Sequence, residues 1–165
     1  MAVLRDTFIR KYTQAIREGN AGIFAGAGLS RASGYVDWKN LLRPLAKEVE
    51  LDIEKEKDLL SVAQYYRNES GTRGGINQEI LNAFNAEVSE NENVEIISRL
   101  PISTYWTTNY DKLIEKELEK KNRKADVKMD SDQLSTVLRD RDAVVYKMHG
   151  DVDHPAHAVL TKDDY

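Results

Sequence analysis

AGIFAGAGLS, residues 21–30, is the stretch of sequence that decides the fold. A short apolar run from Ala21 to Ala25 breaks into Gly26-Ala27-Gly28, the pattern of a buried strand that feeds a tight turn. Glycines at such a turn let backbone N–H groups approach a pyrophosphate near the start of a helix. The full G-x-G-x-x-G pattern is not met, because Arg31 stands where the third glycine belongs. These residues alone leave open both a dinucleotide site and a simple strand-to-loop turn.

The succession of a strand and then a helix recurs further along the chain. ISTYWTTN at 102–109 and DAVVYKMHGD at 142–151 predict two more strands, and ADVKM at 125–129 gives a weaker strand signal. Apolar periodicity predicts helices over 3–18, 37–50 and 111–122, and a shorter helix over 131–140 with Ser131 or Asp132 as its N-cap. Strands alternating with helices predict an α/β fold, a Rossmann-like parallel sheet with flanking helices.

Residues 54–100 are interpreted as a helical insert, with helical patterns at 57–68, 76–88 and 93–100 separated by breakers. We expect one domain over 1–165, with 1–53 and 101–165 as the Rossmann core and 54–100 as the insert. C-terminal strands of the sheet are expected to be missing from the chain. The chain is accordingly expected to be the N-terminal part of a longer protein.

The composition excludes several classes of protein. Cysteine is absent, which removes disulfides, thiolate catalysis and Cys-ligated zinc. No apolar run approaches the ~18 residues of a membrane helix, and the N-terminus lacks the pattern of a signal peptide, so we expect no membrane contact and a cytoplasmic location. A net charge of -4 supplies no broad basic field, and direct binding of nucleic acid is not expected.

Polar residues follow each of the three clearest strands. GAGLS at 26–30 follows the first, Asn109-Tyr110-Asp111 the second, and His149-Gly150-Asp151 the third. The carboxyl ends of parallel strands meet at one edge of a sheet, and ligands of α/β proteins bind there. Gly26, Asn109 and His149 are therefore predicted to surround one cleft.

Three ordered motifs resemble those of the sirtuin family. GAGLSRASGYVDW at 26–38 is similar to the family's glycine-rich signature, TTNYD at 107–111 to its Thr-Gln-Asn-x-Asp, and MHG at 148–150 to its catalytic His-Gly. The resemblance implies that Asn109 and His149 are catalytic, Asn109 at the nicotinamide ribose and His149 as general base. The residues that it implies for NAD binding are Ala25, Gly26, Ala27, Gly28, Ser30, Trp38, Asn109, Asp111 and His149.

The chain also departs from the protein-deacylating sirtuins, which carry a four-cysteine zinc site. The helical insert and the segment VLTKDDY at 159–165 resemble instead the zinc-free NAD hydrolases of bacterial anti-phage systems. That resemblance implies cleavage of NAD, the substrate, into nicotinamide and ADP-ribose, with no metal. It also implies a homo-oligomer and, in some systems, a partner ATPase or nuclease-like protein.

Each candidate residue has an alternative interpretation. Asn109 could be the N-cap of the helix that follows it. His149 could be a structural histidine in a loop, or could join His154, His157, Asp151 and Asp153 in a metal cluster. Pro155 and the lack of i, i+4 spacing disfavour the metal cluster. The acidic pair at 163–164 is expected to be a solvated face.

Two other functions remain open at this level. The first is an NAD-dependent protein deacylase without zinc, which would need a groove for an acyl-lysine peptide. The second is a catalytically silent module that senses NAD or ADP-ribose, which would not need both Asn109 and His149.

Overall fold

The computed structural model describes residues 4–165. Its centre is a parallel sheet of four strands in the order β1-β2-β4-β3. The register aligns Ile23 with Tyr105, and Tyr105 with Val145. The parallel α/β prediction is confirmed, and each strand lies within a predicted stretch: β1 (Ile23–Ala25), β2 (Thr104–Thr107), β3 (Ala125–Lys128) and β4 (Ala143–Lys147).

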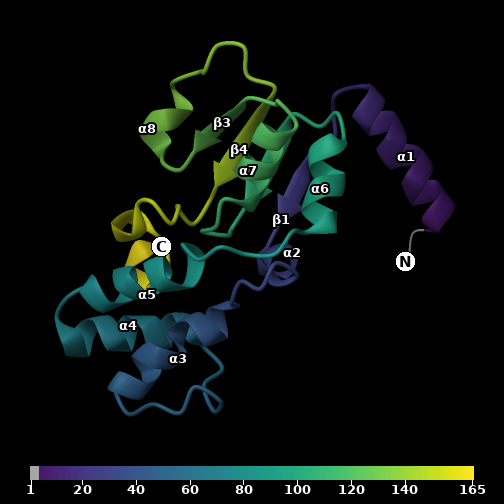
Figure 1. Ribbon diagram of the computed structural model, residues 1–165. Helices are drawn as coiled ribbons and strands as arrows, with labels where there is room; N and C mark the ends of the chain where they lie inside the picture. Colours follow the sequence, from purple (N-terminus) through teal and green to yellow (C-terminus); the bar gives the residue numbers. More distant parts are fainter. Residues whose placement is uncertain (1–3) are drawn as a thin grey trace.

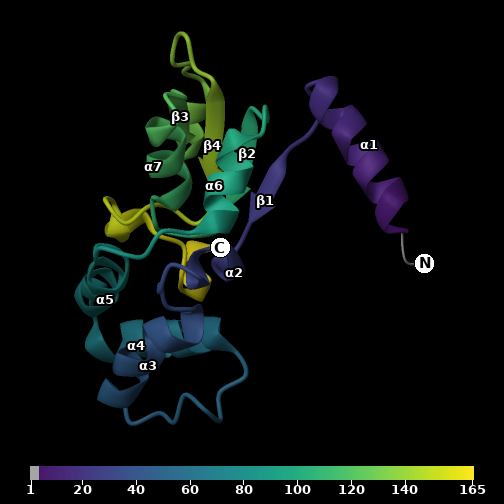
Figure 2. The ribbon, with the colours of Figure 1, turned by 45° about the vertical axis from the view of Figure 1, so that its right-hand side comes forward.

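Helices α6 (Glu92–Arg99) and α7 (Leu113–Lys120) cover one face of the sheet (Figure 1). Ile114 and Leu118 of α7 are buried there with Tyr105 and Val145 of the sheet. Helix α1 (Arg5–Arg17) stands at the β1 side in both views and packs only through partly buried residues such as Tyr12 (Figures 1 and 2). Helix α1 therefore adds little to the core.

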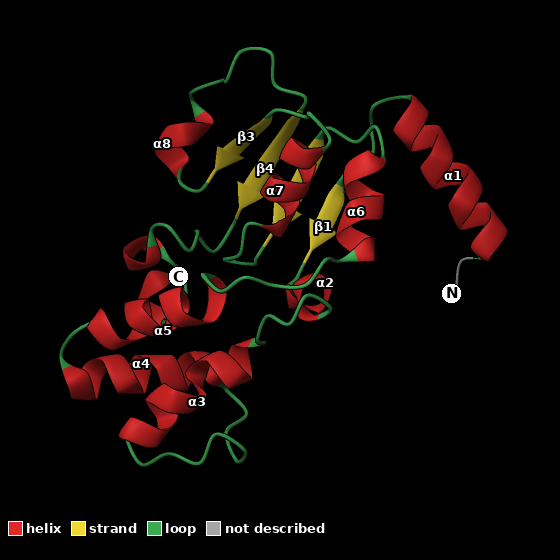
Figure 3. Ribbon diagram, viewed as in Figure 1, coloured by secondary structure: helices red, strands yellow, loops and turns green. Residues whose placement is uncertain are grey.

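A second core lies among helices α3 (Trp38–Glu48), α4 (Leu59–Ser70) and α5 (Gly74–Phe84), which we call the helical unit. Helix α3 begins at Asp37, whose side chain accepts a hydrogen bond from Asn40 N at 2.9 Å, and it buries Leu41, Leu42 and Leu45. The strand arrows point toward this unit (Figure 3). The carboxyl edge of the sheet thus faces the helical unit.

The helices group differently from the expected insert over 54–100. Helix α3, expected in the Rossmann core, packs against α4 and α5, whereas α6, expected in the insert, packs against α7 on the sheet. The reason is that Ile97 of α6 packs against the buried cluster of the sheet, and its carbonyl accepts a hydrogen bond from the hydroxyl of Tyr105 in β2 at 3.0 Å. Apolar periodicity predicts which face of a helix is buried, but not which element packs against that face.

Two local predictions were wrong. The short helix α8 (Ser131–Leu134) is capped by Asp130, whose side chain accepts from Gln133 N at 2.9 Å, and not by Ser131 or Asp132. In the C-terminal segment, with its 3-10 turns η1 (Pro155–His157) and η2 (Lys162–Asp164), Asp163 is exposed as expected, but the side chain of Asp164 is only 17% exposed. It pairs with Arg73 at 2.8 Å, which ties this segment to α5.

No helix in the described part of the chain is both long enough and apolar enough to cross a membrane.

Candidate active site

The loop after β1 leads directly into a short helix, α2 (Ala27–Arg31), with Gly26 at its N-cap position. A Cβ built on Gly28 would have no atom within 4 Å beyond its chain neighbours and the backbone of its own helix, and the backbone of Gly28 is not in the left-handed region. Neither packing nor backbone conformation therefore requires glycine at this position. The open space beside Gly28 fits the close approach of a group from outside the chain, such as a pyrophosphate.

Asn109 joins the loop after β2 to this turn. Its side chain is buried, and Nδ2 donates to the carbonyl of Gly26 at 3.0 Å and to Ser30 Oγ at 2.7 Å. These two bonds use both amide protons, and no donor among residues 4–165 is bonded to Oδ1. The carbonyl dipole of Asn109 is therefore free for a ligand.

The N-cap alternative for Asn109 is wrong, because it is Asp111 that bonds the start of the following helix. Asp111 Oδ1 accepts from Leu113 N at 3.0 Å, and Asp111 Oδ2 accepts from Ser30 Oγ at 2.6 Å. Asn109, Ser30 and Asp111 thus form one buried hydrogen-bonded chain. Such a network holds an amide and a carboxylate in fixed orientations.

These side chains line a narrow pocket between the carboxyl edge of the sheet and the helical unit. Trp38, the first residue of α3, and Phe84, the last residue of α5, form its aromatic walls. Residues 54–100 thus contribute to the wall of the pocket through Phe84. The lining residues are Ala27, Ser30, Val36, Trp38, Phe84, Thr108, Asn109, Tyr110 and Asp111.

His149 follows β4 and lies beside this pocket, against Trp38. The centroids of the two rings are 5.5 Å apart, and His149 Nε2 lies 3.2 Å from the hydroxyl of Tyr165. Burial lowers the pKa of the His149 imidazole below its usual 6.5. A histidine of this kind is unprotonated at neutral pH, which is the state a general base requires.

Gly150 fixes the turn after His149. Its φ is +88°, and an added Cβ would lie 3.0 Å from the Cα of Ala158. The backbone conformation and the close approach of Ala158 therefore require glycine at position 150, whereas neither reason applies at Gly28.

The structure brings most of the predicted residues together. The pocket is lined by Ala27, Ser30, Trp38, Asn109 and Asp111. The Gly26 carbonyl accepts a hydrogen bond from Asn109, and the Trp38 ring packs against His149. Ala25 is buried within β1, and its carbonyl accepts from Thr108 N at 3.3 Å. Sequence reasoning missed the pocket residues Val36, Phe84, Thr108 and Tyr110. All but Phe84 carry a signal, because they lie within the motifs at 26–38 and 107–111.

His154 and His157 lie in the loop that contains η1, away from the Asn109 pocket. Within residues 4–165, no three His, Asp or Glu side chains are grouped so that they could hold a metal ion.

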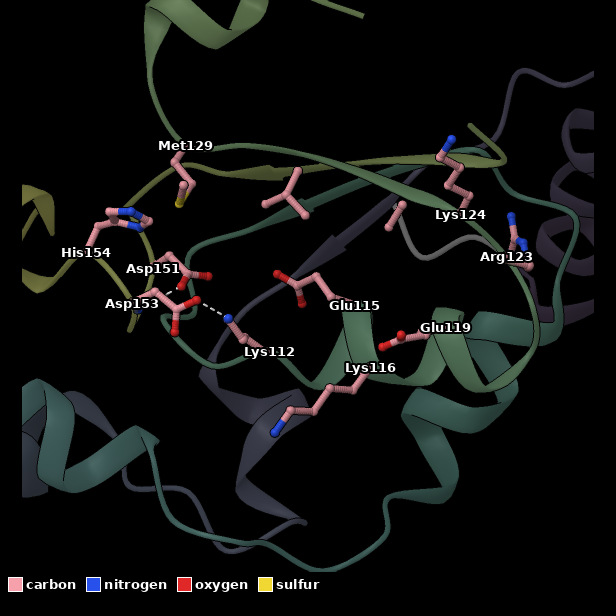
Figure 4. A pocket seen from close by; sticks show the side chains of 12 residues that line it. Lys112, Glu115, Lys116, Glu119, Arg123, Lys124, Met129, Asp151, Asp153 and His154 are labelled. Carbon is pink, nitrogen blue, oxygen red and sulfur yellow. Dashed lines mark hydrogen bonds and ion pairs between the residues drawn. The ribbon is translucent and has the colours of Figure 1, made fainter. Parts of the chain in front are cut away.

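A wider groove of about 590 Å³ lies between α7 and β3, and it contains none of the predicted site residues (Figure 4). Lys112 and Lys116 stand on one side of it, and Asp151, Asp153 and His154 close one end. Lys112 and Asp153 neutralise each other in an ion pair. Because charges of both signs line this groove, it favours no single class of ligand, and the narrower pocket remains the candidate active site.

The chain is similar to one domain family and to several proteins of known name. Residues 103–165 match the family model of the SIR2-like domain. The chain is 60% identical over 161 residues to the NAD(+) hydrolase ThsA of Bacillus cereus (strain MSX-D12), a match that covers 97% of this chain and 34% of the relative.

Two further proteins of the same name are similar over the whole or nearly the whole chain. The protein of Cytobacillus dafuensis is 50% identical over 165 residues, covering 100% of this chain and 33% of the relative, and that of Enterococcus faecium is 48% identical over 162 residues, covering 98% and 34%. The chain spans about a third of the length of the relatives it matches. Over residues 103–165 the chain is similar to the SIR2-like domain family, and these relatives extend the similarity over nearly its whole length.

Proposed function

We propose that this chain is the NAD-binding domain, a single unit over 1–165, of an NAD+ glycohydrolase that cleaves NAD into nicotinamide and ADP-ribose. The observation that carries the proposal is the buried chain of Asn109, Ser30 and Asp111 in one pocket, with His149 adjacent to it. The printed name of the relatives, NAD(+) hydrolase, supports the choice of substrate.

The proposed reaction breaks the bond between ribose C1′ and the nicotinamide nitrogen. The electron pair of that bond leaves with nicotinamide, which departs as a neutral molecule, and positive charge develops at the ribose. Water then forms the new bond to C1′ and loses one proton. NAD and water are thus converted into nicotinamide, ADP-ribose and a proton.

The residues of the pocket suit these steps. The Asn109 Oδ1 dipole stabilises the positive charge that develops at the ribose, and the Asp111 carboxylate adds negative potential next to it. His149, kept unprotonated by burial, accepts the proton of the attacking water or of a ribose hydroxyl. The open side of Gly28 is the proposed place for the pyrophosphate.

The alternatives are less well supported. A deacylase would need a groove for an acyl-lysine peptide beside His149, whereas the wider groove lies elsewhere, between α7 and β3. A silent NAD-sensing module has no use for a positioned base, yet His149 lies against Trp38 of the same pocket.

The resemblance to anti-phage NAD hydrolases supports a wider setting for this activity. We propose that the whole protein depletes NAD in the cytoplasm of infected cells, as a homo-oligomer and without a metal cofactor. Phe8 and Ile9 of α1 are exposed, as is Leu4 just before it, which supports an interface with another copy. A partner ATPase or nuclease-like protein belongs to the same proposal, and direct binding of nucleic acid does not.

The experiment that tests the proposal compares single alanine variants of the whole protein. Asn109→Ala and His149→Ala should each lower nicotinamide release by at least ~100-fold, since a positioned base or dipole commonly contributes about 10²–10⁴ in rate. In the double variant the losses should fall short of additive, because both groups act on one ribose.

His154→Ala and His157→Ala are the matched controls and should keep the wild-type rate, also in the presence of a chelator. Circular dichroism checks that each variant is folded. Full activity in folded His149→Ala would rule out the proposed base. Loss of activity in a control together with sensitivity to chelator would favour a metal site.

A further inference from the structure

We infer that Lys147 is a positioning residue. Its buried ammonium group fixes the position of the loop after β2, which carries Asn109, relative to the loop after β4, which carries His149. This inference rests on the proposed function. Lys147 is the last residue of β4, two positions before His149, and its side chain is 0% exposed. A fully buried lysine at the edge of a candidate active site requires a physical reason.

The first set of contacts holds the loop after β2. Lys147 Nζ donates to the carbonyl of Tyr110 at 3.1 Å and also to the carbonyl of Asp111. The Tyr110 carbonyl accepts a second bond, from Val152 N at 3.0 Å. The backbone that carries Asn109 and Asp111 is therefore bound directly to the chain segment that carries His149.

The second set of contacts holds the loop after β4. Lys147 Nζ forms an ion pair with Asp151 Oδ2 at 2.6 Å, and Asp151 Oδ1 accepts from Asp153 N at 2.8 Å. Asp151 stands two positions after His149. One ammonium group thus contacts both loops that carry the proposed catalytic residues.

The single ammonium group of Lys147 faces two carboxyl groups, those of Asp151 and Glu115. Glu115 Oε1 also lies 3.1 Å from Nζ, but it is not aligned for a hydrogen bond and has no other partner among residues 4–165. Burial raises the pKa of the Glu115 carboxyl. Figure 4 shows the side chains of Glu115 and Asp151 pointing toward the same place from α7 and from the loop after β4.

A buried ion pair is a poor way to stabilise a fold, because hydrophobic side chains of similar volume commonly do as well or better. What a methionine could not do is bind two carbonyl oxygens and a carboxylate from two separate loops. The specific contribution of Lys147 is therefore the relative placement of Asn109 and His149. Misplacement of catalytic groups by about 1 Å can cost about 100-fold in rate.

Three variants of the whole protein separate this role from a merely structural one. Lys147→Met removes the ammonium, and Lys147→Met with Asp151→Asn also removes the charge of the carboxylate that forms the shorter of its two ion pairs. Lys128→Met is the matched control, because Lys128 ends β3, is also buried, and pairs with Asp126 at 2.8 Å outside the site. Thermal unfolding and the kinetics of nicotinamide release are measured for each, with kinetics well below every Tm.

We expect kcat to fall about 10- to 100-fold in both Lys147 variants, with a smaller change in KM for NAD. The double variant should recover part of the Tm lost in Lys147→Met without recovering kcat. Lys128→Met should lose Tm but keep kcat. Recovery of kcat together with Tm in the double variant, or an equal loss of kcat in Lys128→Met, would overturn the inference.

Amide hydrogen exchange gives a readout that does not depend on activity. The N–H groups of Asn109, Leu113 and Val152 donate within these two loops and should exchange faster in both Lys147 variants but not in Lys128→Met. If the wild-type protein releases no nicotinamide, the proposed function fails and exchange alone decides the role of Lys147. Unchanged exchange in both Lys147 variants would overturn that role.

Discussion

The His149 imidazole is half-buried against Trp38, and the loss of hydration there lowers its pKa below 6.5. A general base acts in its unprotonated form, so kcat/KM should stay level through neutral pH and fall only below an inflection that lies under 6.5. Trp38→Ala exposes the ring and should move this inflection upward, toward 6.5. A pH profile of kcat/KM for both proteins measures it. A wild-type inflection above 6.5, or one that Trp38→Ala leaves unmoved, would contradict this account of His149.

Gly28 and Gly150 offer a matched pair of substitutions with opposite expectations. Gly28→Ala meets no atom within 4 Å beyond its chain neighbours and its own helix and should leave stability within about 0.5 kcal/mol, while raising KM for NAD because its methyl group occupies the open side of the turn. Gly150→Ala should destabilise by about 1–3 kcal/mol, because its φ is +88° and its new Cβ would lie 3.0 Å from Ala158 Cα. Denaturant unfolding and NAD kinetics measure both effects. An unchanged KM in Gly28→Ala would argue against a pyrophosphate at this turn.

Individual residues differ in how far the sequence could predict them. Asn109 and His149 could be found because each directly follows a strand, and strand ends meet at one edge. Phe84 could not be found, since its place in the pocket depends on how α5 packs more than twenty residues away from the nearest motif. The role of Lys147 could not be predicted either, because a lysine inside a strand ordinarily indicates an exposed position.

At the scale of elements, the carboxylate of Asp164 helps to hold the C-terminal segment 158–165 at the start of α5. Asp164 pairs with Arg73 and accepts backbone bonds from Leu160 at 3.0 Å and Thr161 at 2.7 Å. Burial by itself would raise the pKa of Asp164, but these hydrogen bonds outweigh it and lower the pKa to about 2. The segment ends at Tyr165, beside His149, so its anchoring also affects the site.

Asp164→Asn should therefore destabilise the protein at pH 7, by about 1.5–3 kcal/mol for hydrogen bonds to a charged group. Because the folded-state pKa lies below the ordinary 3.8, this stabilisation is complete above pH 4 and is lost as pH falls from 3.8 toward 2. Unfolding measured between pH 7 and pH 2 should show the variant and wild-type curves converging. Asp163→Asn, a change at a 60% exposed side chain, is the control. A constant gap between Asp164→Asn and wild type down to pH 2 would contradict the pairing.

Strands and helices themselves were largely predictable from periodicity, whereas their partners were not. The run from Ala21 to Ala25 and the β-branched stretch at 102–109 predict strands without reference to anything distant. The packing of α3 with α4 and α5, and of α6 with α7, depends on contacts between segments. An apolar stripe predicts that one face of a helix is buried, but it does not predict which element packs against that face.

For the whole molecule, the pocket lies where two hydrophobic cores meet. The sheet supplies the polar residues through the loops after β1 and β2, and the helical unit supplies the aromatic walls through Trp38 and Phe84. Assembly of the site therefore needs both cores folded. This arrangement places the proposed chemistry in a narrow pocket with aromatic walls, where the dipole of Asn109 acts more strongly than it would in water.

The most direct test of the central claim measures nicotinamide release from NAD by the whole protein, with and without an acetyl-lysine peptide. A glycohydrolase transfers the ribose to water, so nicotinamide and ADP-ribose should form in equal amounts and at the same rate whether or not the peptide is present. Release that occurs only with the peptide, accompanied by an acetylated ADP-ribose product, would contradict the account and establish a deacylase.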